Sequence, residues 1–164
     1  MFAQINGLPL HALVLHAAVV LAPLAGAVAM ATLVTRWRSA LRLPLVAVTA
    51  AATATVFVAT RSGTALRASM ADQLSGVTGT LVQRHQVLGE RLLISLLVLL
   101  AVAVGAAVAH GRTGAFRVGA AGSVLATVVG VGVLVLTYQT GEAGAKARWN
   151  PDGSVNYSAT QTGS

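Results

Sequence analysis

Three of the four histidines carry the greatest capacity for chemistry in this sequence. His11 and His16 lie at the start of the first apolar segment, and His85 precedes the third. Imidazole binds haem iron and other transition metals, and it exchanges protons near neutral pH. If the apolar segments are membrane helices, these three side chains approach one another near one border of the membrane. The sequence therefore predicts a histidine-containing polar site there.

The occupant of this site has several interpretations. The leading one is a b-type haem for electron transfer, with His16 and His85 as axial ligands and His11 as a spare. His11 and His16 cannot both face one ligand, because five residues turn a helix by about 140°. A second interpretation is a divalent metal, held by His11, His16 and His85 together with the carboxylates of Glu90 and Glu142. The others are a proton relay and histidines that only hydrogen-bond neighbouring helices.

Four long apolar segments must position these histidines. Apolar residues make up 55% of the chain and charged residues only 9%, whereas about a quarter of an average soluble protein is charged. The segments span residues 8–34, 43–60, 92–109 and 118–139, and none contains Asp, Glu, Lys or Arg. About 18 or more apolar residues suffice to cross roughly 30 Å of hydrocarbon. We expect an all-α bundle of four transmembrane helices over residues 1–145, followed by a polar, disordered tail over 146–164.

The connections between the segments also predict structure. Residues 64–74 have apolar side chains at helical spacing among polar ones, which predicts a short amphipathic helix on the surface or a continuation of the second segment. A glycine-containing break follows, and we expect the next helix to begin near Thr80.

The arginines predict the orientation. Arg36, Arg38 and Arg42 lie in the short link between the first two segments, and Arg112 and Arg117 lie between the last two. Short loops rich in arginine stay in the cytoplasm. All four acids fall on the opposite side. We therefore expect a protein of the bacterial inner membrane with both termini, and the longer loop between helices two and three, on the outer side.

Small residues recur at every fourth position in two segments. They are Ala47 and Ala51 in the second, and Gly122, Ala126 and Gly130 in the fourth. Small side chains let helix backbones approach closely in lipid. The pattern predicts tight packing within the bundle. It also suits an alternative function, that of a cofactor-free accessory or scaffold subunit in a larger membrane complex or a homo-oligomer.

Composition argues against other functions. The chain has no cysteine, so disulfides, thiolate metal sites and iron–sulfur clusters are excluded. We find no hydrolase or transferase motif and predict no catalytic residue, so any enzymatic role would be a redox or electron-transfer one. The net charge of +7 is spread beside apolar segments without a basic helix face, which favours a lipid bilayer over nucleic acid as partner.

Several short motifs resemble one known family. The motifs are residues 5–11 (INGLPLH), residues 15–17 (LHA), residues 36–38 (RWR), His85 with Gly89, and residues 140–145 (TGEAGA) with Trp149. They are similar to the bacterial membrane family known as domain of unknown function 2231. The resemblance covers nearly the whole chain and implies a four-span inner-membrane protein of uncharacterised function. Members often carry an acidic motif after the second span, where this chain reads TRSGT over residues 60–64, so the resemblance weakens a carboxylate-rich metal site.

Overall fold

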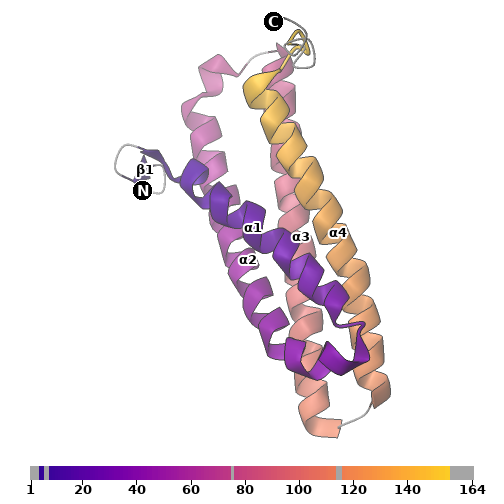
Figure 1. Cartoon of the computed structure of the whole chain (residues 1–164). Coiled ribbons are helices and arrows are strands. Elements are labelled where there is room, and N and C mark those ends of the chain that lie inside the picture. Colours follow the sequence, from indigo (N-terminus) through magenta and orange to yellow (C-terminus); the bar gives the residue numbers. More distant parts are fainter. Residues whose placement is uncertain (1–3, 6–7, 75, 114–115, 156–164) are drawn as a thin grey trace, which may run out of the picture.

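Four long helices make up most of the computed structural model, which describes residues 4–5, 8–74, 76–113 and 116–155 (Figure 1). The helices are α1 (Leu10–Ala31), α2 (Thr35–Ser69), α3 (Gly76–Thr113) and α4 (Phe116–Trp149). A short 3-10 helix, η1 (Ala71–Gln73), lies between α2 and α3, and an antiparallel pair of two-residue strands, β1 (Gln4–Ile5) and β2 (Leu8–Pro9), precedes α1. The predicted all-α four-helix bundle is confirmed.

All four helices are long and apolar enough to cross a membrane. The 22 residues of α1 span about 33 Å, which matches the thickness of the hydrocarbon layer. The other three helices have 34 to 38 residues and are therefore too long to lie wholly within hydrocarbon. Figure 1 shows α1 crossing the others obliquely, with α2, α3 and α4 continuing past its N-terminal end. The four helices thus make the chain a multi-pass membrane protein.

Helices α2, α3 and α4 extend beyond the predicted apolar segments, whereas α1 is shorter than the predicted 8–34, because residues 8–9 form a strand and residues 32–34 form a turn. Because α2 begins at Thr35, the arginines of the first predicted link lie in its first turns, and because it ends at Ser69, the continuation of the second segment is confirmed. Helix α3 begins at Gly76 rather than near Thr80. Helix α4 ends at Trp149, so the first residues of the predicted tail are helical. Residues 156–164 of that tail lie outside the described residues. In α2, α3 and α4, high hydropathy identifies only the part of the helix that suits the hydrocarbon layer. The backbone hydrogen bonds of these helices continue beyond that part.

The core is packed with small side chains at the crossing of α1 and α4. On α1, Ala22, Ala25 and Ala29 are fully buried. A Cβ atom on Gly26 would lie 2.8 Å from the carbonyl oxygen of Gly130, and one on Gly130 would lie 2.9 Å from the Cβ of Ala29. Lipid provides no hydrophobic drive for helix association, so this backbone contact supplies packing energy instead.

Of the two predicted small-residue patterns, the one in α4 is buried and the one in α2 is exposed. In α4, Gly122 and Gly130 pack closely on α3 and α1, and Ala126 is only 2% exposed, so this pattern packs the bundle. In α2, Ala47 and Ala51 are exposed, and the buried face is formed by other residues, among them Thr49, Ala52 and Val56. The expectation that Ala47 and Ala51 pack the bundle therefore needs correction. Alanine occurs on every side of α2, so its spacing could not identify the inner face.

We predict that Gly130→Ala lowers the free energy of unfolding by about 1–3 kcal/mol, the usual cost of overpacking. The added methyl group would meet Ala29 at 2.9 Å. The matched control is Gly132→Ala on the same helix, where a Cβ has no neighbour within 4 Å. Denaturant titration in detergent measures both variants. Equal stability of the two variants would contradict the close contact between α1 and α4.

Candidate functional site

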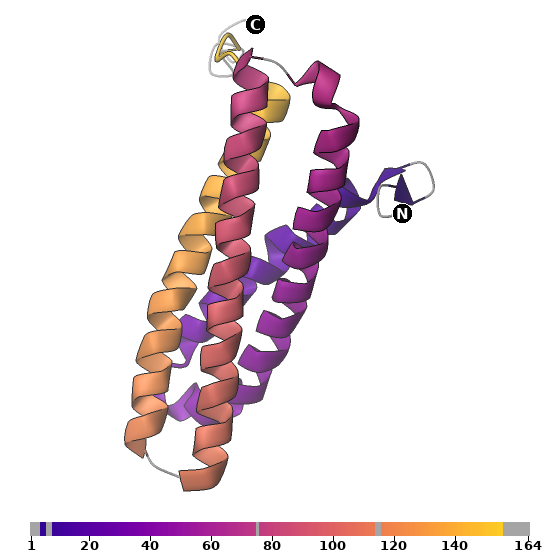
Figure 2. The ribbon, with the colours of Figure 1, turned by 180° about the vertical axis from the view of Figure 1, so that it is seen from behind.

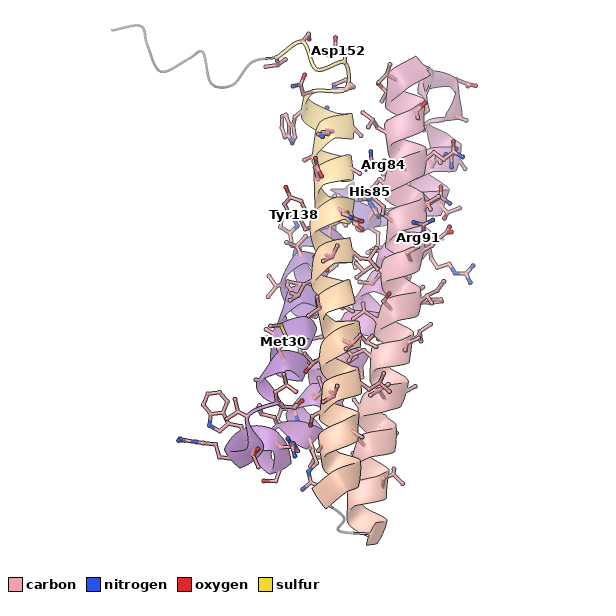
Figure 3. All side chains as sticks on the ribbon, turned by 90° about the vertical axis from the view of Figure 1, so that its right-hand side faces the viewer. Met30, Arg84, His85, Arg91, Tyr138 and Asp152 are labelled. Atoms are coloured by element: carbon pink, nitrogen blue, oxygen red, sulfur yellow. The ribbon has the colours of Figure 1, made fainter. Side chains whose placement is uncertain are left out.

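His11 and His85 form a pair between the helices. Their ring centres are 6.2 Å apart, and the ring planes are nearly perpendicular, at 88°. His11 lies in the first turn of α1 and His85 lies in α3, and both side chains are half-buried. Figure 3 views the bundle from the side of α3 and α4 and shows His85 between these helices. The site thus joins residues 74 positions apart in the chain.

A backbone carbonyl fixes each ring. Nδ1 of His11 lies 2.8 Å from the carbonyl oxygen of Ala59 on α2, and Nδ1 of His85 lies 2.8 Å from that of Thr140 on α4. A carbonyl oxygen can only accept, so Nδ1 carries the hydrogen in both rings. In the neutral rings Nε2 is therefore the atom with the lone pair. Histidines that bind metals are usually held in this way by their second nitrogen.

A glycine gives each ring access to its carbonyl. In a regular helix the carbonyl of Ala59 accepts the N–H of Gly63, and that of Thr140 accepts the N–H of Gly144. A Cβ on Gly63 would lie 3.0 Å from two ring atoms of His11, and one on Gly144 would lie 3.0 Å from two ring atoms of His85. A larger residue would cover the second lone pair of the carbonyl. Neither glycine was predicted as a site residue, although each lies four residues after the residue whose carbonyl binds a histidine.

His16 does not join the pair. Its side chain is exposed, and its Nδ1 lies 3.0 Å from the carbonyl oxygen of Ala12, one turn earlier in α1. The structure brings His11 to His85, which corrects the predicted pairing of His16 with His85. The sequence indicated how deep each histidine lies along its helix. Which side of α1 faces α3 depends on the rotation of α1 about its axis, and the packing of the bundle sets that rotation.

The carboxylates of the second interpretation have other partners. Oε1 of Glu90 accepts a hydrogen bond of 3.2 Å from Gln86, and Oε1 of Glu142 pairs with Lys146 at 2.7 Å. Among the residues that the structure describes, no group of three or more His, Cys, Asp or Glu side chains is placed to hold a metal ion. The predicted set of three histidines with Glu90 and Glu142 is therefore not assembled, and the pair supplies two protein ligands.

Two contacts join helices α2 and α3 near His85. Arg67 of α2 donates a hydrogen bond of 2.7 Å to Gln86 of α3. One turn away, a Cβ on Gly89 of α3 would lie 3.7 Å from the methyl group of Thr60 on α2. These contacts hold the two helices together at the level of the histidines.

The spacing of the rings fits a shared metal centre. Imidazole nitrogens bind metals such as zinc at about 2.0–2.1 Å, so two rings on one centre have their ring centres roughly 5–6.5 Å apart, depending on the angle at the metal. The observed 6.2 Å lies towards the wide-angle end of this range.

Comparisons with known proteins add no assignment. No family model matches the chain, and no curated protein or solved structure matches it significantly. The resemblance to domain of unknown function 2231 therefore stays a prediction from the motifs.

We predict that Gly144→Ala displaces the His85 ring, because the new methyl group would meet two ring atoms at 3.0 Å. Loss of the bond to Thr140 should lower the free energy of unfolding by about 1 kcal/mol. The ¹⁵N chemical shifts of the His85 ring should change as well. Gly141→Ala is the control, since a Cβ there has no neighbour within 4 Å. Unchanged His85 shifts in Gly144→Ala would contradict the close packing of ring and glycine.

Proposed function

We propose that this chain is a membrane redox protein in which His11 and His85 bind one transition-metal centre. The observation that carries the proposal is the pair itself, with ring centres 6.2 Å apart and each Nδ1 directed to a carbonyl oxygen. This arrangement leaves the two Nε2 atoms as the ligands. Imidazole suits zinc, copper, iron and nickel.

The metal centre has two possible sources, haem iron and a bare ion. The number of ligands favours haem, because its iron takes four nitrogens from the porphyrin and needs only two from the protein. The packing favours an ion, because a porphyrin needs far more room than an ion, and the hydrogen bond from Arg67 to Gln86 already joins α2 and α3 next to His85. Both sources share the same chemistry, a Lewis-acidic metal between two imidazoles.

The position of the pair supports a role at a membrane border. His11 is in the first turn of the helix that matches the membrane thickness, and the charged residues Arg84, Glu90 and Arg91 lie on α3 at the same end. A bound redox metal would supply one-electron transfer there. The protein would contribute the two nitrogens, their fixed tautomer and a half-buried surrounding that limits access of water.

We predict that His11→Ala and His85→Ala each abolish the bound metal or chromophore, whereas His16→Ala retains it. The exposed His16 lies on the same helix, and within the described part of the chain its ring bonds to Ala12 of that helix, which makes it the matched control. Absorption spectra of the purified protein, oxidised and reduced with dithionite, and elemental analysis of the same samples measure the effect. Circular dichroism confirms that each variant is folded.

The spectra and the metal content separate the two sources. A Soret band with near-stoichiometric iron means haem, and stoichiometric copper or iron without a Soret band means a bare redox ion. Zinc has no redox chemistry, so stoichiometric zinc would contradict the redox role. A preparation without metal or colour, from cells supplied with both, would refute the proposal. The histidines would then only join the helices, and the accessory or scaffold role would be the function to test.

We also propose that the histidine pair faces the outer side of a bacterial inner membrane. The arginines in the first turns of α2, next to the α1–α2 connection, support this orientation, because arginine-rich segments between neighbouring spans stay in the cytoplasm. Figure 2 shows this connection at the end of the bundle opposite the junction between α2 and α3.

Because the chain has no cysteine, single cysteines can test the orientation. Ser69→Cys at the end of α2 should react with a membrane-impermeant maleimide in intact spheroplasts. Ser39→Cys near its start should react only after the membrane is opened. Both serines are exposed, so they form a matched pair. The reverse labelling pattern would place the histidines on the cytoplasmic side.

A further inference from the structure

A cavity lies between α2, α3, α4 and the turn that joins α1 to α2, at the end of the bundle opposite the histidines. Its volume is about 160 Å³. Arg38 and Arg42 of α2 line it together with two hydroxyl-bearing residues, Thr32 in the turn after α1 and Ser123 of α4. Thr35 and Ser39 of α2 also line the cavity. The other lining residues are apolar and mostly small, namely Leu45, Ala103, Ala106, Gly119, Gly122 and Ala126. The cavity therefore combines a cationic edge with an apolar floor.

The two guanidinium groups are held in place. Nε of Arg38 donates to the carbonyl oxygen of Thr32 at 3.3 Å, and Nε of Arg42 donates to that of Ser39 at 3.2 Å. The stem of Arg38 also passes over Gly119, where a Cβ would lie 3.7 Å from its Cδ. A guanidinium group has five N–H donors, so one such bond leaves Arg42 with four more. The fork of a guanidinium group matches the oxygens of phosphate.

The acidic side chains of the chain lie away from this cavity. The four acids are Asp72, Glu90, Glu142 and Asp152, all in the half of the bundle that carries the histidines, and none lines the cavity. Two half-buried guanidinium groups at one edge of a cavity attract an anion at the membrane border.

We propose that this cavity binds the phosphate of an anionic phospholipid. Arg38 and Arg42 hold the phosphate oxygens, and the small side chains below them contact the glycerol and the first methylene groups of the acyl chains. A free phosphate ion would gain nothing from the apolar floor. A zwitterionic headgroup would bring its amine next to two arginines. Basic pockets between membrane helices bind anionic headgroups in this manner.

The proposal is tested with delipidated protein in detergent and a tail-labelled phosphatidylglycerol as probe. We expect the wild-type protein to bind this lipid at least about tenfold more tightly than phosphatidylcholine. Arg38→Gln and Arg42→Gln should each weaken its binding roughly tenfold or more, which is the usual effect of losing one charge-assisted bond. The control is Arg36→Gln, because Arg36 lies over the ring of Trp37 and does not line the cavity. Arg36→Gln also removes one positive charge from the start of α2, and it should change the affinity less than about twofold.

Three results would overturn the proposal. Equal binding of the two lipids would remove the preference for an anion. An equal loss in Arg36→Gln and Arg42→Gln would mean attraction to the overall charge of this end. Displacement of the probe by millimolar inorganic phosphate as effectively as by unlabelled phosphatidylglycerol would identify free phosphate as the occupant. Thermal unfolding controls for folding, and Arg42→Gln decides the matter if Arg38→Gln does not fold.

Discussion

A polar group inside a membrane must find its partner within the protein, and this constraint explains much of the structure. Hydrocarbon offers no water to hydrogen-bond a hydroxyl or an imidazole. The hydroxyl groups of Thr53, Ser123 and Thr137 accordingly donate to carbonyl oxygens one turn earlier in their own helices. The hydroxyl of Thr49 is buried and has no partner among the described residues. His11 and His85 differ from these hydroxyl groups, because they satisfy the constraint across helices.

Glycine serves both the packing and the candidate site. Gly26 and Gly130 bring the backbones of α1 and α4 into contact, which fixes the position of α1. Gly63 and Gly144 leave room for an imidazole ring beside a helix carbonyl. In each case the missing side chain lets a group approach the backbone of another helix. The same device thus holds the bundle together and orients the two histidines.

The two ends of the bundle have different chemistry. Gly119, which lines the arginine cavity, and Thr140, which binds His85, are about six turns apart on α4, or roughly 30 Å. This distance equals the thickness of the hydrocarbon layer. One end therefore presents two imidazoles among mixed charges, and the other presents arginines without an acid. Proposals for the two ends rest on separate residues and can fail separately.

The sequence by itself determined that the chain has four membrane-length helices, because 18 or more apolar residues without a charge suit lipid and little else. It also indicated that histidines gather near one border, since helix length and turn direction fix the depth of each residue. It could not tell whether His11 or His16 meets His85. That choice depends on how α1 is rotated about its axis, and the contact of Gly26 with Gly130 sets this rotation. The outward position of Ala47 and Ala51 has the same cause, because the mutual packing of four helices, and not the pattern in any one of them, decides which faces are buried.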